Sequence, residues 1–132
     1  MTRVLVADDS ETILLLLRTR LEMEGYEVST ATDGQEVVEA LAAMEPGQEP
    51  HLILLDAMMP GLSGFEVLRR LKSDPTLRAV PVIMVTAKGH ERDVLSGLRG
   101  GAVDYVVKPF SLKELAARVD LALRKEPPAT AS

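Results

Sequence analysis

Two adjacent aspartates, Asp8 and Asp9, follow the mainly apolar stretch Arg3–Ala7 of this 132-residue chain. Neighbouring carboxylates repel each other, and a cation held between them removes that repulsion. Two interpretations are open at this point. The pair is either a solvated strand end, in which Asp9 or Ser10 caps the following helix, or part of a cation site. Taken alone, the pair favours the first interpretation.

Three further polar side chains stand directly after mainly apolar runs: Asp56 after residues 51–55, Thr86 after 81–85 and Lys108 after 103–107. A carboxylate beside a cation and a lysine can attack phosphorus and form an acyl phosphate. The cation and the lysine would stabilise charge on the transferring group, and a threonine hydroxyl can donate to a phosphoryl oxygen. This chemistry requires that the residues meet, so it depends on the elements that carry them.

Apolar runs alternate with segments of helical periodicity along the whole chain. The expected strands are residues 3–7, 26–31, 51–55, 81–85 and 103–107. Capping-box pairs open three of the intervening helices; these pairs are Asp33 with Glu36, Ser63 with Glu66 and Ser111 with Glu114. Such an alternation predicts an α/β fold with a mainly parallel sheet covered by helices on both faces.

In such a sheet the carboxyl ends of the strands lie at one edge, where ligands bind. The polar residues after the strands should therefore converge there. Three carboxylates and one ammonium give a formal charge of about −2, which one divalent cation neutralises. Short aspartates with oxygen-only ligands suit Mg²⁺, with Mn²⁺ as the alternative ion. The cation-site interpretation of Asp8 and Asp9 is now the better one.

Composition sets the broad class of protein. Apolar residues make up 46% of the chain, enough for one core, and we expect one domain over residues 1–125 with a polar tail over 126–132. A net charge of −5 argues against a nucleic-acid surface. The absence of cysteine fits a reducing cytoplasm, and no segment reaches the ~20 apolar residues of a transmembrane helix.

Four segments, VLVADDS, LILLDAMMPGLSG, VIMVTA and DYVVKPF, resemble the signature segments of bacterial two-component response-regulator receiver domains. The resemblance runs over residues 3–124, and four motifs in the right order are specific. It implies a flavodoxin-like (βα)5 fold with strand order 2-1-3-4-5, as in single-domain chemotaxis response regulators.

The resemblance assigns roles to individual residues. Asp56 matches the phosphoacceptor, and Asp8 and Asp9 match the acidic pair that holds Mg²⁺ together with Asp56. The main-chain carbonyl of Met58 matches the remaining protein ligand of the metal. Met58 also occupies one of two positions that tune hydrolysis of the acyl phosphate, and the other is Lys88. A bulky apolar Met58 should obstruct water, which predicts slow to moderate self-dephosphorylation.

Four more matches concern the response to phosphorylation. Thr86 matches the switch hydroxyl, Lys108 the lysine that holds the phosphoryl group, and Tyr105 the aromatic residue that turns inward on activation. Pro109 matches the proline that follows a cis peptide bond in the family.

The function that the resemblance implies is a phosphorylation switch, which catalyses only its own phosphotransfer and dephosphorylation, and not an enzyme with a separate substrate. Neither His51 nor His90 falls at a strand end beside Asp8, Asp9 and Asp56, so phosphohistidine should come from a sensor histidine kinase or a histidine phosphotransfer protein. The altered surface over residues 90–99 and 103–124 should signal to a protein target, or to an effector domain outside this chain. We expect a cytoplasmic protein without nucleic-acid or membrane contacts of its own, as a monomer or a phosphorylation-dependent dimer.

Three other functions would use a similar fold or similar chemistry. An aspartate-nucleophile phosphohydrolase usually carries a second aspartate where this chain has Met58. A receiver-fold interaction module that works without phosphorylation needs none of the five polar residues. A flavin-binding protein of similar topology would carry a phosphate-binding loop after the first strand, which is absent from the sequence.

Overall fold

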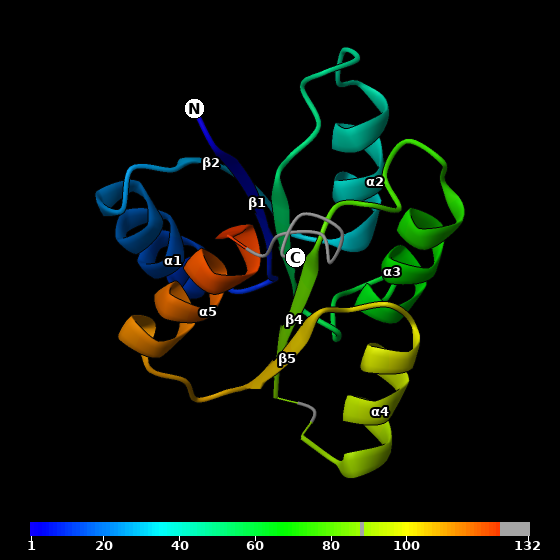
Figure 1. The fold of residues 1–132 in the computed structure, drawn as a ribbon. Helices are drawn as coiled ribbons and strands as arrows, with labels where there is room; N and C mark the ends of the chain where they lie inside the picture. The colour runs from blue at the N-terminus through cyan, green and yellow to red at the C-terminus, as the bar shows by residue number, and fades with distance from the viewer. Residues whose placement is uncertain (88, 125–132) are drawn as a thin grey trace, which may run out of the picture.

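Five strands alternate with five helices in the computed structural model, which describes residues 1–87 and 89–124 (Figure 1). The strands are β1 (Arg3–Ala7), β2 (Glu27–Ala31), β3 (Leu52–Leu55), β4 (Val82–Thr86) and β5 (Asp104–Val107). The helices are α1 (Glu11–Met23), α2 (Gly34–Ala42), α3 (Gly64–Ser73), α4 (Glu91–Arg99) and α5 (Leu112–Arg124).

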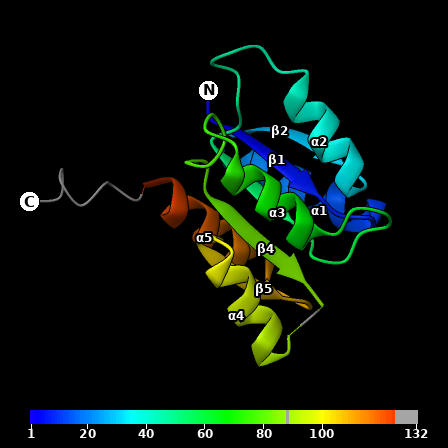
Figure 2. The same cartoon turned by 90° about the vertical axis from the view of Figure 1, so that its right-hand side faces the viewer.

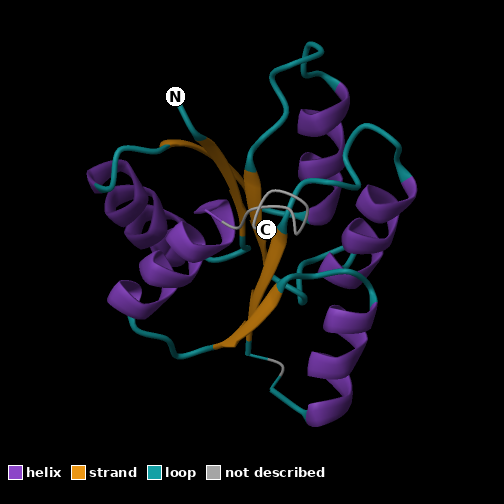
Figure 3. Ribbon diagram, in the orientation of Figure 1, coloured by secondary structure: helices purple, strands orange, loops and turns teal. Residues whose placement is uncertain are grey.

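All strand pairs are parallel, and the sheet has the order β2-β1-β3-β4-β5. Helices α1 and α5 cover one face of the sheet, and α2, α3 and α4 cover the other (Figures 1 and 2). The strands therefore form the middle of three layers (Figure 3). This architecture confirms the predicted flavodoxin-like fold and its strand order.

The central strands are buried on both faces, as their unbroken apolar runs predict. Side chains alternate between two cores because successive strand residues point to opposite faces. Leu52 and Leu54 of β3 pack with α1 and α5, whereas Ile53 and Leu55 pack in the core beneath α2, α3 and α4. Both cores hold the ends of β1, β3 and β4 in fixed register.

Side-chain caps begin four of the helices. The oxygens of Ser10, Asp33, Ser63 and Ser111 each accept a hydrogen bond from a backbone N–H three residues later. Ser10, and not Asp9, therefore caps α1, which leaves the carboxylate of Asp9 available for another role. Helix α4 differs, because His90 stands at its N-cap without a capping side-chain hydrogen bond.

Several element boundaries differ by one residue from the sequence prediction. Strands β2, β3 and β5 begin one residue late, and β4 runs from Val82 to Thr86 instead of over residues 81–85. Apolar character marks burial, whereas a strand is bounded by its ladder of hydrogen bonds, and Pro81 has no N–H to donate. The predicted tail over 126–132 lies outside the described residues. Among those described, no helix combines the length and hydropathy that a bilayer span requires.

Candidate functional site

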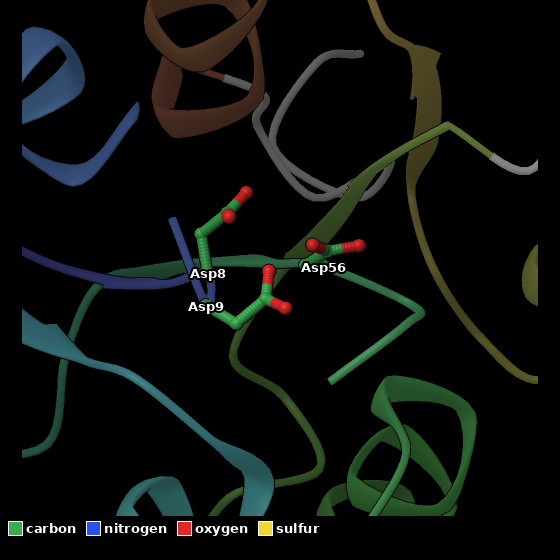
Figure 4. Close-up of side chains that lie close together, drawn as sticks. All are labelled: Asp8, Asp9 and Asp56. Atoms are coloured by element: carbon green, nitrogen blue, oxygen red, sulfur yellow. The ribbon is translucent and has the colours of Figure 1, made fainter. Parts of the chain in front are cut away.

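Asp8, Asp9 and Asp56 meet at the carboxyl edge of the sheet (Figure 4). Ala7 pairs with Leu55 in adjacent strands, so the residues that follow β1 and β3 emerge side by side. Each aspartate offers a carboxylate oxygen, and these three atoms lie within 4.8 Å of one another. Asp8 and Asp56 are buried, whereas Asp9 is exposed to solvent. The pocket is therefore fixed on its inner side and open at Asp9.

Lys108 brings the positive charge to this pocket from the end of β5. Its Nζ lies 2.7 Å from Oδ2 of Asp8 and 3.2 Å from Oδ2 of Asp56. Burial by itself would lower the pKa of Lys108, but the hydrogen bonds to the two carboxylates and their charges outweigh burial. The pKa of Lys108 consequently lies above its ordinary value, and the side chain remains an ammonium at neutral pH.

Backbone amides fix the other oxygen of each buried carboxylate. The N–H of Ser10 donates to Oδ1 of Asp8 at 2.9 Å, and the N–H of Met58 donates to Oδ1 of Asp56 at 3.0 Å. Both aspartates thus have one oxygen held by the chain and one directed to Lys108. Their carboxylates are oriented before any ligand arrives, which is the preorganisation that electrostatic catalysis requires.

The loop after Asp56 curls back against it because two glycines allow the turn. Gly61 has a φ of +73°, which favours glycine. A Cβ on Gly64 would collide with the backbone oxygen of Asp56 and lie 2.7 Å from Cα of Ala57. The N–H of Gly64 instead donates to the carbonyl of Ala57 at 3.0 Å. The glycines of PGLSG therefore allow this loop to lie against Asp56.

Sequence reasoning missed Gly34, the first residue of α2. A Cβ there would collide with the carbonyl oxygen of Leu62, so α2 packs directly on the loop that follows Asp56. The available signal was a glycine immediately after the N-cap Asp33, a position where glycine has no advantage for helix formation.

The remaining predicted residues differ in their burial. Thr86 ends β4 and is fully buried, and Tyr105 of β5 is buried beneath α4. The peptide bond between Lys108 and Pro109 is cis, and the Met58 side chain is half exposed. His51 and His90 are both exposed and outside the carboxylate cluster, while Lys88 lies outside the described residues.

The donor set fits a hard divalent cation. All three side-chain donors are carboxylates, which Mg²⁺ prefers to nitrogen or sulfur ligands. Mg²⁺ also keeps several waters, and the exposed side of the pocket at Asp9 gives them room. Asp8, Asp9 and Asp56 are therefore the residues that would hold the ion.

Comparison with known proteins agrees with this geometry. Residues 4–120 match the family model described as the response regulator receiver domain. The chain is 45% identical over 126 residues to the phosphate regulon transcriptional regulatory protein PhoB of Rhizobium meliloti (strain 1021), covering 96% of this chain and 54% of that protein. It is 47% identical over 117 residues to the response regulator PleD of Caulobacter vibrioides (strain NA1000 / CB15N), covering 89% of this chain and 25% of that protein.

Solved structures give the same result. The BeF3-activated DrrB receiver domain matches with a TM-score of 0.83 and 32% identity, over 95% of this chain and 99% of that one. The chemotaxis protein CheY4 of Vibrio cholerae matches with a TM-score of 0.83 and 29% identity, over 92% and 98% respectively. The chain spans about half the length of PhoB and a quarter of PleD. By sequence, fold and acidic pocket, it belongs to the response regulator receiver domain family.

Proposed function

We propose that Asp56 accepts a phosphoryl group from a phosphohistidine of a partner protein. One observation carries this proposal: the ammonium of Lys108 contacts the buried carboxylates of both Asp8 and Asp56. A carboxylate oxygen of Asp56 attacks phosphorus, the phosphorus–nitrogen bond breaks, and the imidazole nitrogen keeps the electron pair. The partner would be a sensor histidine kinase or a histidine phosphotransfer protein.

Different groups around Asp56 would stabilise the negative charge of the transferred phosphoryl group. Lys108 can follow the oxygens of the transferred group, because a lysine is a flexible point charge with three donors. Thr86, buried at the end of β4, would donate its hydroxyl to a phosphoryl oxygen. Mg²⁺, when held by Asp8, Asp9, Asp56 and the Met58 carbonyl, would supply the charge that offsets the three carboxylates and the incoming phosphoryl group.

Phosphorylation of Asp56 would shift the equilibrium between two conformations of the surface formed by α4, β5 and α5. Thr86 ends β4, and Tyr105 of the adjacent strand β5 pairs with Met84, two residues before Thr86. A shift of the Thr86 side chain would therefore change the packing around Tyr105. The relatives PhoB and PleD are longer than this chain, which supports an effector domain as one recipient of the signal. A separate target protein is the other.

A phosphohydrolase function is the rival that shares the acyl-phosphate chemistry. Such an enzyme needs a general acid or base to turn the intermediate over. Met58, two residues after Asp56, has no titratable group and is half exposed. Turnover of a phosphate monoester such as p-nitrophenyl phosphate would favour the hydrolase, and single-turnover labelling would favour the switch.

The experiment is labelling with acetyl phosphate and Mg²⁺, followed by intact mass spectrometry. Wild-type protein should gain one phosphoryl group, and the Asp56→Asn variant should gain none. The exposed Glu11→Gln variant is the matched control, because it removes a nearby carboxylate outside the pocket. Full labelling of Asp56→Asn would overturn the proposal.

A further inference from the structure

Gly97 stands inside helix α4, where its conformational freedom is a disadvantage. The helix runs over Glu91–Arg99, and glycine is among the poorest residues in a helix interior. Gly97 is also the one residue of α4 that is buried. Alanine would suit both the helix and an apolar environment, so the local backbone gives no reason for glycine here.

The aromatic ring of Tyr105 gives that reason. A Cβ on Gly97 would lie 2.8 Å from Cδ2 and 3.0 Å from Cε2 of the ring. The next atom, Cγ of Met84, lies at 3.6 Å, which is an ordinary van der Waals contact. Among the nearest neighbours, the ring alone would have to move to admit a side chain at Gly97.

The ring lies between the sheet and α4. Tyr105 of β5 pairs with Met84 of β4, and both side chains belong to the core beneath α3 and α4, against which Val94 also packs. Tyr105 is only 9% exposed. The space that a side chain at Gly97 would occupy is thus taken by the aromatic ring of Tyr105 from the neighbouring strand.

We infer that Gly97 is a positioning residue for Tyr105, because the space left by its missing Cβ is where the ring lies, and any side chain there turns the ring outward toward solvent. The packing part of this inference stands without the proposed function. Its consequence for signalling rests on that function: if Tyr105 reports phosphorylation of Asp56, Gly97 sets how easily the ring takes its inward position.

The inward position of the ring also sets the electrostatic environment of the phenol. The pKa of Tyr105 is raised, first by burial and then by the negative charges of Asp93 in α4 and Asp56 in the pocket. A ring turned outward would lose the first of these causes.

The chain offers a clean optical test, because it has two tyrosines and no tryptophan. In a Tyr26→Phe background, all tyrosine fluorescence comes from Tyr105. Acrylamide should quench it weakly. Adding Gly97→Ala should raise the quenching constant toward that of free N-acetyltyrosinamide, whereas Ser96→Ala, an exposed change in the same helix, should leave it unchanged. An unchanged constant in folded Gly97→Ala protein would overturn the inference.

A double-mutant cycle with Tyr105→Val covers the case in which Gly97→Ala folds poorly. Valine has no δ or ε atoms, so nothing remains at the points of collision. Gly97→Ala should raise the urea midpoint in the Tyr105→Val background, because alanine favours the helix, and should lower it or raise it less beside Tyr105. The same shift in both backgrounds, or failure to fold in both, would contradict a role for the ring.

Acetyl-phosphate labelling separates this inference from the proposed function. Labelling of the wild-type protein tests the proposed function alone, because neither the quenching test nor the double-mutant cycle uses phosphorylation. If wild-type protein is not labelled but the quenching and cycle results hold, the proposed function fails and the inference survives. If labelling succeeds and both tests fail, the reverse is true.

Discussion

The ammonium nitrogen of Lys108 lies 2.7 Å from Oδ2 of Asp8. The same nitrogen lies 3.2 Å from Oδ2 of Asp56, so one cation from the end of β5 joins the ends of β1 and β3 across β4. Asp8 and Asp56 are almost fully buried, and Lys108 is mostly so. An ion pair in this setting is screened less than a surface pair. Lys108 thus acts as the counter-ion that the chain itself supplies.

Removing this counter-ion should destabilise the protein in the absence of Mg²⁺. The Lys108→Met variant leaves two buried carboxylates unpaired, so its free energy of unfolding should fall by about 1–3 kcal/mol. Mg²⁺ at about 100 times its Kd adds about 2.7 kcal/mol to any protein that binds it only when folded. In the variant, Lys108 no longer competes with Mg²⁺ for the carboxylates of Asp8 and Asp56. Mg²⁺ should therefore bind the variant more tightly and restore much of the lost free energy of unfolding.

Urea unfolding with and without Mg²⁺ measures both effects. The control is Lys113→Met, since Lys113 is an exposed lysine on α5, and its unfolding should resemble that of the wild type. Equal urea midpoints for Lys108→Met and Lys113→Met in EDTA would show that the ion pairs of Lys108 do not contribute to stability.

The loop beside Asp56 should tolerate no side chain at Gly64. A Cβ there meets backbone atoms of Asp56 and Ala57, which cannot swing aside as a side chain can. We expect Gly64→Ala to lower the free energy of unfolding by about 1–3 kcal/mol or more and to slow labelling. Gly61→Ala is the comparison, because its cost comes from a positive φ and not from a collision, and it should be smaller, about 1–2 kcal/mol. Equal costs for the two variants would refute the close approach.

How far the sequence predicted this pocket depends on the kind of feature. Local sequence patterns predict the strands LILL and VIMVT and the caps at Asp33 and Ser63. They also predict that the residues after the strands converge. The nearer approach of Lys108 to Asp8 than to Asp56 could not be predicted, because it depends on side-chain packing between strands distant in sequence. The packing of Tyr105 against Gly97 could not be predicted for the same reason, although a glycine inside a helical pattern was a visible signal.

Alkaline pH should weaken the protein through Tyr105. Burial, followed by the charges of Asp93 and Asp56, raises the pKa of its phenol above the ordinary 10.0. The unfolded chain therefore loses this proton first as pH rises. Stability linked to this group is complete below pH 10.0 and declines as pH climbs through the raised pKa, by up to about 1.4 kcal/mol per pH unit.

Urea unfolding between about pH 9 and pH 11 measures this decline, and Tyr105→Phe should make it shallower. Some slope should remain, because Tyr26 and Lys108 also have raised pKa values with the same sign. Identical slopes for wild type and Tyr105→Phe would mean that the phenol is not buried in the folded protein in solution.

Met58 should control the lifetime of the acyl phosphate. Its N–H fixes Oδ1 of Asp56, while its side chain stands half exposed beside the pocket. A bulky apolar group there should obstruct the attacking water, and an amide should orient it. Met58→Asn should therefore shorten the lifetime of the phosphorylated form, followed as decay of the intact-mass label, whereas Met58→Leu should preserve it. Unchanged decay in Met58→Asn would remove this role.

The central claim is that one carboxylate among three receives the phosphoryl group, and chemical mapping tests it most directly. Borohydride reduces an aspartyl phosphate to homoserine, so peptide mass spectrometry of reduced, labelled protein identifies the acceptor. We predict homoserine at position 56 alone, with Asp8 and Asp9 unmodified. Homoserine at position 8 or 9, or no conversion in fully labelled protein, would contradict the account.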